Sequence, residues 1–101
     1  MIGEALRLIR TIKGYKAKDL AQKLAISPSY LSQIEKGQKR PSYELIEKFA
    51  EAVEERTSTI VFFSEEYTKL KDNPLSVLTR PVVMKFLRVI ANDDSTYQRK
   101  D

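Results

Sequence analysis

The chain contains no cysteine, no histidine and no tryptophan among its 101 residues. The absence of cysteine excludes disulfides and thiolate metal sites, and the absence of histidine removes the commonest general base and transition-metal ligand. No apolar run approaches the ~20 residues that a transmembrane helix needs. The start of the chain, Met1 to Glu4, lacks the basic region and the apolar stretch of a signal peptide. We therefore expect a soluble cytoplasmic protein that binds a partner, with no cofactor and no membrane association.

Patterns that would indicate catalysis are also missing. No glycine-rich phosphate loop and no metal-ligand spacing occurs, and serine without histidine makes a hydrolytic triad implausible. Neighbouring residues on a helix point apart, so adjacent acidic residues make poor acid/base pairs. Three such pairs are present: Glu54 with Glu55, Glu65 with Glu66, and Asp93 with Asp94. The sequence predicts that the chain is not an enzyme.

Positive charge is concentrated in the first half of the chain. The net charge is +4, and the segment from Arg7 to Arg40 holds nine basic residues but only Asp19 and Glu35 as acidic ones. The residues after Val53 hold eight basic and eight acidic side chains. This asymmetry favours a unit that binds a polyanion, joined to a second, neutral segment. A solvated lysine-rich surface is the alternative.

Apolar spacing predicts four short helices in the first half. We expect them over residues 4–13, 16–24, 28–36 and 42–53. Gly14 and Gly37 are suited to end the first and third, because glycine readily adopts the left-handed conformation found after helices. Ser27-Pro28 is a strong start signal for the third helix, with serine as the cap and proline in the first turn. Ser42 is the expected cap of the fourth.

The second half carries two further apolar stripes. Residues 57–70 contain apolar side chains at helical offsets, although their strand propensity leaves an extended conformation open. Residues 71–74 interrupt the helical pattern, and a last amphipathic helix is expected to begin at Pro81 and end near Asn92. We expect the polar tail, residues 93–101, to fray.

Two helices joined by a short turn in a basic segment are typical of a helix-turn-helix. The run from Lys16 to Gly37, KAKDLAQKLAISPSYLSQIEKG, resembles the Cro/C1-type (XRE) helix-turn-helix family, as do the preceding LRLIRTIKGY and the following KRPSYELIEKFAEAV. The resemblance implies an all-α fold: a five-helix lambda-repressor-like DNA-binding domain over residues 1–64. Residues 65–92 would be a helical extension, and residues 93–101 a polar tail.

The sequence departs from the family pattern in two places. The family usually has a capping residue followed by glutamine at the start of the second helix, where this chain has Lys16-Ala17. The turn between the two helices commonly has glycine where this chain has Ala25, and a left-handed alanine costs on the order of 1 kcal/mol.

The resemblance also implies roles for individual residues. Arg10 and Glu35 match positions that form a structural ion pair. The third helix would enter the major groove of double-stranded DNA, with Leu31 and Ile34 facing inward. Base reading then falls to the outward positions, which are Pro28, Ser29, Ser32 and Gln33. Phosphate contacts are expected from Lys16, Lys18, Ser27, Tyr30, Lys36, Gln38, Lys39 and Arg40. For Tyr30, covering the core is the alternative.

The stripes of the second half predict a homodimer, because an amphipathic helix needs something to cover its apolar side. The interface residues expected are Ile60, Phe63, Tyr67, Val83, Phe86, Leu87 and Ile90. The alternative is that the last helix packs on its own domain. The leading functional hypothesis is a dimeric repressor of phage or mobile-element type that binds a palindromic operator. The other is an antitoxin or adaptor whose second half holds a protein partner.

Overall fold

The computed structural model describes residues 2–72, 81, 83–85, 87–88 and 91, and all regular structure within this part of the chain is helical. Five continuous helices follow one another: α1 (Ile2–Ile12), α2 (Ala17–Lys23), α3 (Pro28–Glu35), α4 (Tyr43–Ala52) and α5 (Thr57–Asp72). The all-α prediction is confirmed, and the first four helices lie within two residues of their expected bounds.

The helix ends follow the signals in the sequence. The hydroxyl oxygen of Ser27 accepts the backbone N–H of Tyr30 at 3.0 Å, and that of Ser42 accepts the N–H of Leu45 at 3.1 Å. Each serine thus satisfies one of the unpaired donors at the start of a helix. After α1 and α3 the chain turns through Gly14 and Gly37, whose φ angles are +82° and +79°. Both are left-handed values that favour glycine.

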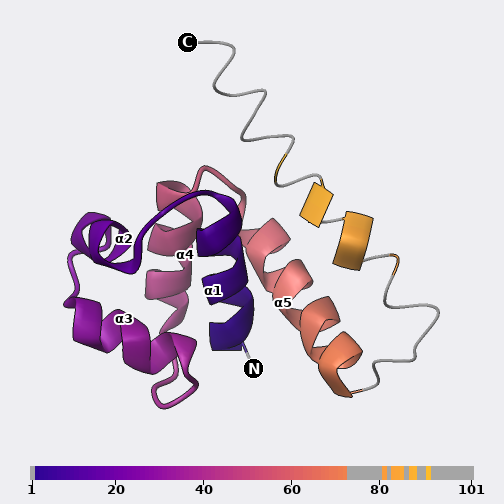
Figure 1. Cartoon of the computed structure of the whole chain (residues 1–101), viewed down its shortest axis with the longest axis horizontal. Coiled ribbons are helices and arrows are strands. Elements are labelled where there is room, and N and C mark those ends of the chain that lie inside the picture. The colour runs from indigo at the N-terminus through magenta and orange to yellow at the C-terminus, as the bar shows by residue number, and fades with distance from the viewer. Residues whose placement is uncertain (1, 73–80, 82, 86, 89–90, 92–101) are drawn as a thin grey trace, which may run out of the picture.

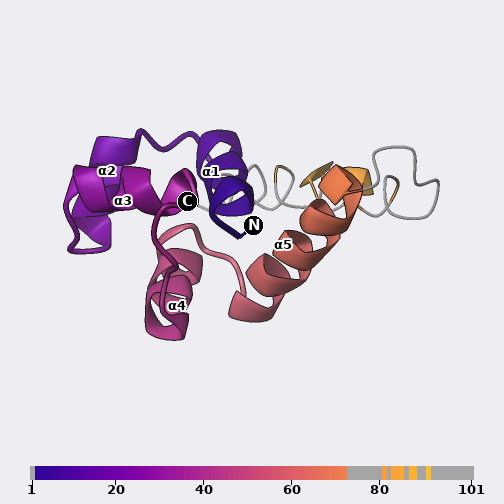
Figure 2. The ribbon, with the colours of Figure 1, turned by 90° about the horizontal axis from the view of Figure 1, so that it is seen from below.

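Helix α1 lies at the centre of the domain, with α3 on one side and α5 on the other (Figure 1). Figure 2 shows that α1, α2 and α3 share one layer, while α4 lies beneath them and α5 slopes between the two levels. Because the helix-turn-helix formed by α2 and α3 sits at one edge of this arrangement, one side of α3 is left uncovered by the other helices.

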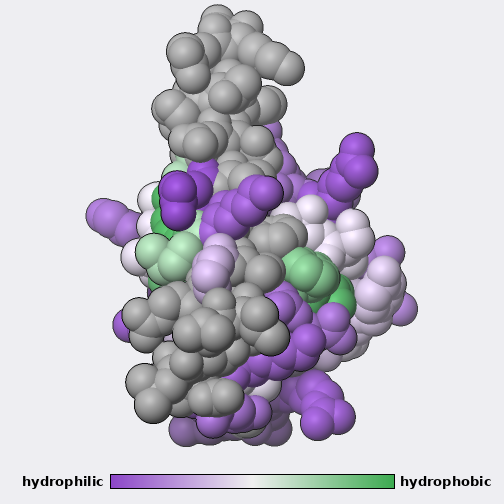
Figure 3. Space-filling model, turned by 90° about the vertical axis from the view of Figure 1, so that its right-hand side faces the viewer, coloured by the Kyte–Doolittle hydropathy of each residue, from purple (hydrophilic) through white to green (hydrophobic). Residues whose placement is uncertain are grey.

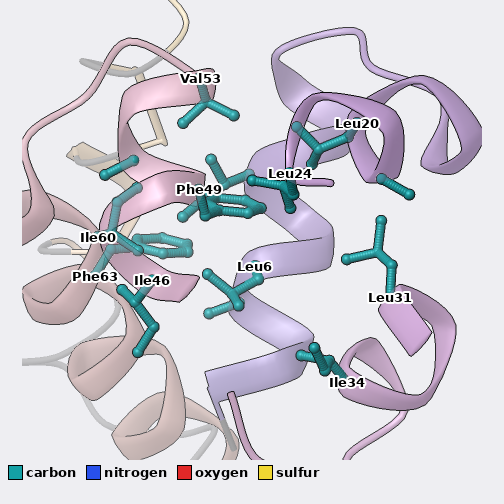
Figure 4. Packing of buried hydrophobic residues seen from close by; sticks show 14 of the residues in the cluster. Leu6, Leu20, Leu24, Leu31, Ile34, Ile46, Phe49, Val53, Ile60 and Phe63 are labelled. Carbon is teal, nitrogen blue, oxygen red and sulfur yellow. The ribbon is translucent and has the colours of Figure 1, made fainter. Parts of the chain in front are cut away.

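A single hydrophobic core is built from every helix (Figure 4). Helix α1 contributes Leu6 and Ile9, and the helices around it supply one or two large side chains each. Those that are almost entirely buried include Leu20, Leu31, Ile34, Phe49, Val53, Ile60 and Phe63. Ala21 is fully buried where α2 approaches its neighbours, a position that only a small side chain fits.

The N-terminal turn of α1 touches the end of α3 directly. Gly3 is buried, and a Cβ atom at this position would collide with the backbone carbonyl of Ile34. The absence of a side chain therefore allows the two backbones to approach. This contact fixes the C-terminal end of α3 against the central helix.

Residues 57–70, for which the sequence left a helix or an extended conformation open, form part of helix α5. It runs without interruption from Thr57 to Asp72, so this segment is not extended, and it continues through residue 64, the expected end of the DNA-binding domain. The described residues among 81–91 are also helical. The rest of that segment and the tail at 93–101 lie outside the described residues.

The residues expected at a dimer interface differ in burial within the described part of the chain. Ile60, Phe63 and Val83 are buried in the core of their own protomer, with exposed fractions of 0–2%. Their apolar surface is covered within one chain, and their contact with a second copy stays a prediction. Tyr67 and Leu87 are partly buried and pack against the same core. Phe86 and Ile90 lie outside the described residues.

None of the helices that the structure describes is both long enough and apolar enough to span a membrane.

Candidate nucleic-acid interface

The turn between α2 and α3 closes with a left-handed residue. Ala25 has a φ angle of +57°. The left-handed conformation agrees with the glycine that the family commonly has at this position. The N–H of Ile26 donates to the carbonyl of Ala21 at 3.0 Å, and the N–H of Ala25 donates to the carbonyl of Gln22 at 3.1 Å. These bonds satisfy the last carbonyls of α2 and set the angle at which α3 leaves the turn.

Helix α3 has a core side and an outer side. Leu31 and Ile34 are buried, with exposed fractions of 1% each. On the outer side the four residues expected to read bases fall into two groups: Pro28 and Ser29 are exposed, whereas Ser32 and Gln33 are half-buried.

Five exposed cations flank α3, and we call them the basic rim: Lys16, Lys18, Lys36, Lys39 and Arg40. The first two lie at the start of α2, and the other three follow α3. The backbone N–H groups of Gln38 and Lys39 both donate to the carbonyl of Gln33, at 2.8 and 3.2 Å. The loop after α3 is therefore folded onto the end of the helix, and Gln38 itself is exposed.

Two residues expected to contact phosphate have a structural role as well. Ser27 is exposed, and its hydroxyl oxygen serves as the cap of α3. Because that oxygen acts as an acceptor, its proton is left to donate elsewhere. Tyr30 is half-buried and packs against the core, as the alternative for this residue anticipates.

Arg10 and Glu35 form a partly buried ion pair between α1 and the end of α3. The guanidinium Nε donates to Oε2 of Glu35 at 2.7 Å, and Nη2 donates to Oε1 at 3.1 Å. The side chains are 14% and 7% exposed. Nη1 of Arg10 also donates to the backbone carbonyl of Tyr15 at 2.9 Å. Paired guanidinium–carboxylate bonds fix orientation as well as distance, so this contact holds α3 against α1.

The model of the family described as "Helix-turn-helix" matches residues 6–58, just over half of the chain. The match includes all of α2, the turn and α3. The chain belongs to the helix-turn-helix family, in its Cro/C1-type (XRE) branch.

Curated relatives of this helix-turn-helix protein carry regulator names. It is 34% identical over 67 residues to the HTH-type transcriptional regulator SinR of Bacillus licheniformis, a match that covers 65% of this chain and 60% of that protein. Identity to SinR of Bacillus subtilis is 36%, over 60% of this chain and 56% of the relative. SlrR of Bacillus subtilis is 42% identical over 54% of this chain and 36% of its own length. The chain thus spans three fifths or less of these relatives.

A solved structure shows the same arrangement of helices. The clp gene regulator ClgR from Corynebacterium glutamicum superposes with a TM-score of 0.67 at 31% identity, covering 70% of this chain and 76% of that one. The fold of this helix-turn-helix protein is therefore the lambda-repressor-like fold that the resemblance implies.

Two internal contacts of the helix-turn-helix domain were missed by the sequence reasoning. Nζ of Lys13 donates to Oε2 of Glu55 at 2.7 Å, and both side chains are buried, so Lys13 adds nothing to the positive surface. Tyr15 bonds to α2 and α4 through its hydroxyl group. Lys13 comes directly after α1 and four positions after the buried Ile9, an offset that could have marked it as core-facing. No pattern in the sequence reveals its partner 42 residues away.

Within the described residues, no three acidic side chains come close enough together to hold a metal ion.

Proposed function

We propose that this chain is a sequence-specific DNA-binding transcription regulator, a dimeric repressor of phage or mobile-element type that binds a palindromic operator. The observation that carries the proposal is the two-sided character of α3: its apolar side belongs to the core, while its polar side is framed by the basic rim. The relatives' names as HTH-type transcriptional regulators support the same reading.

The side chains on α3 suit the major groove. The amide of Gln33 can donate and accept at once, which matches the N6 and N7 positions of adenine. Ser29 and Ser32 each offer one hydroxyl that can serve either kind of base edge, and Pro28 offers an apolar contact such as a thymine methyl group needs. This set favours a site containing A·T pairs.

The basic rim suits the DNA backbone. Lysine and arginine on phosphates fix the register and orientation of a protein on the duplex without reading sequence. Gln38 and the Ser27 hydroxyl add neutral donors close to the same edge. In this proposal the rim supplies most of the affinity and α3 supplies the specificity.

The test is the selection of bound duplexes from a random pool by the purified protein, followed by substitution of the proposed base reader. Gln33→Ala should weaken binding to the selected site about 5- to 150-fold, which corresponds to about 1–3 kcal/mol, and should change binding to random DNA little. Gln22→Ala, the same change at an exposed position of α2, is the matched control. Equal weakening on both DNAs would show that Gln33 does not read a base.

A dimer would match the symmetry of the operator. Two recognition helices related by a twofold axis reach successive major grooves when they lie about 34 Å apart, so half-sites should be centred ~10–10.5 base pairs apart, or a multiple of that. A palindromic consensus with this spacing is the expected result of the selection. A single asymmetric half-site would contradict the dimer.

Part of the apolar stripe on α5 is covered within the chain, and other apolar side chains nearby stay exposed. Two large apolar side chains on α5 and on the following helical residues remain substantially exposed, Phe62 at 41% and Met84 at 47%. Among the coloured residues in Figure 3, small hydrophobic areas are bordered by hydrophilic ones. Phe62→Glu should convert the dimer to a monomer in sedimentation, whereas Ser58→Glu, an exposed change on the same helix, should not. A chain that is monomeric at micromolar concentration and binds DNA with little salt dependence would favour the antitoxin or adaptor function.

A further inference from the structure

Tyr15 lies in the link between α1 and α2 and joins elements that are separate in the sequence. Its hydroxyl donates to the backbone carbonyl of Ala52, the last residue of α4, at 3.2 Å. The same oxygen accepts a hydrogen bond of 3.0 Å from Nζ of Lys23 in the last turn of α2. The ammonium group of Lys23 also lies 5.0 Å from the centre of the Tyr15 ring, within the range of a cation–π contact.

The backbone of Tyr15 is held as firmly as its side chain. Its N–H donates to the carbonyl of Arg10 at 3.0 Å, and its carbonyl accepts Nη1 of Arg10 at 2.9 Å. Since the remaining guanidinium donors of Arg10 bind Glu35, one chain of bonds connects Tyr15 to the end of α3. Tyr15 is therefore bonded to α1, α2 and α4 directly and to α3 through one residue.

Helix α2 needs such a contact more than the other helices do. It has only seven residues, and helices this short are not stable on their own. Its N-cap position is occupied by Lys16, whose side chain makes no capping bond, whereas α3 and α4 are both capped by serine. The hydrogen bond that Nζ of Lys23 donates to the Tyr15 hydroxyl is the main cause of a raised pKa at Lys23.

We propose that Tyr15 is a positioning residue for DNA binding, whose hydroxyl fixes the orientation of α2 and thereby places Lys16 and Lys18 against the DNA backbone. The inference rests on the proposed function. The hydroxyl gives α2 a side-chain bond at its last turn, whereas the first turn has no capping bond. Without the hydroxyl, α2 keeps its buried Leu20 and Ala21 but loses the hydrogen bond from Lys23, which connects it through Tyr15 to α4.

The test is the salt dependence of binding in Tyr15→Phe, measured by fluorescence anisotropy on a labelled duplex that carries the selected site. The ring and its packing remain, so the chain should fold. Each lost phosphate contact lowers the magnitude of the log–log slope by about 0.9, and we expect a decrease of about 0.9 to 1.8. Tyr43→Phe, the same change at an exposed tyrosine at the start of α4, is the matched control and should leave the slope unchanged.

A second variant, Lys23→Met, keeps the stem of the side chain and removes the bond to the hydroxyl. A reduced slope in both variants supports the proposal. A reduced slope in Tyr15→Phe alone supports it too, because the hydroxyl would then act through its bond to Ala52. A reduced slope in Lys23→Met alone would mean that Lys23 itself contacts phosphate, and would overturn it. An unchanged slope in Tyr15→Phe with only a lower melting temperature would also overturn it, since that is what a purely structural role produces. A flat slope for the unaltered protein would instead refute the proposed function, and this inference with it.

Discussion

Replacing Arg10 by methionine should destabilise the domain strongly, because it leaves the Glu35 carboxylate buried without its donors. Both hydrogen bonds that the structure gives this carboxylate come from Arg10. Removing one partner of a buried ion pair costs about 3–5 kcal/mol. Since the two side chains are 14% and 7% exposed, the lower end of that range applies, about 3 kcal/mol. In a domain of this size that corresponds to a fall in melting temperature of roughly 12–24 °C.

Urea unfolding followed by circular dichroism measures this effect. Arg10→Met should lower the unfolding midpoint without changing the m-value, because the surface exposed on unfolding is almost the same. The matched control is Lys69→Met, which breaks the solvent-exposed pair with Glu66 at 3.0 Å on α5 and should cost less than about 0.5 kcal/mol.

The double variant Arg10→Met/Glu35→Met separates the pair from the individual residues. Two unbranched apolar side chains can fill the space that the pair occupies, so the double variant should be more stable than the sum of the single changes predicts. The expected coupling is on the order of 1–3 kcal/mol. Single changes that add to within about 0.5 kcal/mol would refute the reasoning, because they would show that the bidentate geometry contributes nothing to stability.

Three further predictions concern charge and packing. The log–log salt slope of DNA binding should be about −4.5 per protomer, if each of the five cations of the basic rim neutralises one phosphate at about −0.9; a slope shallower than about −2 in a titration with KCl would contradict that count. Gly3→Ala should lower the unfolding free energy by about 1–3 kcal/mol or more, because its Cβ atom collides with the carbonyl of Ile34; unchanged urea unfolding would mean that α1 does not touch α3 there. The hydrogen bond from Lys71 lowers the pKa of the Glu4 carboxyl below its ordinary value of 4.5. The contribution of this pair to folding stability is therefore present above pH 4.5 and is lost as the pH falls through the lowered pKa. In Lys71→Ala, carbon-13 NMR should show the pKa of Glu4 returning upward.

Local signals in the sequence predicted the helix-turn-helix well, because they act over a few residues. Ser27 and Ser42 cap the helices that they were expected to cap, and Gly14 and Gly37 adopt left-handed angles after α1 and α3. Ala25 does the same without being glycine, which only the resemblance to the family could indicate. Caps and left-handed residues depend on short-range geometry, so they can be read without knowing the tertiary structure.

Contacts between distant residues could not be read in this way. The bond from Lys13 to Glu55 spans 42 positions, and the pattern of charges along the chain places Lys13 among the cations available to DNA. Its burial removes it from that set. Net charge therefore gives the correct sign for the surface around α3 but overstates the number of phosphate contacts, since a charge can be neutralised inside the domain as well as outside it.

The apolar stripe on α5 likewise does not reveal its partner from the sequence, and that partner matters for how the protein assembles. A stripe in a sequence reports that a side of a helix is covered, but the same pattern results whether the cover is another helix of the chain or a second molecule. Here Ile60 and Phe63 are covered by their own domain, together with Val83 from beyond α5. Near this stripe, the large apolar side chains that stay exposed among the described residues are Phe62 and Met84, and a dimer that uses the stripe would add contacts there. If two protomers bind one operator, the shared DNA raises their effective concentration, so even a small interface between them would be strengthened on the DNA.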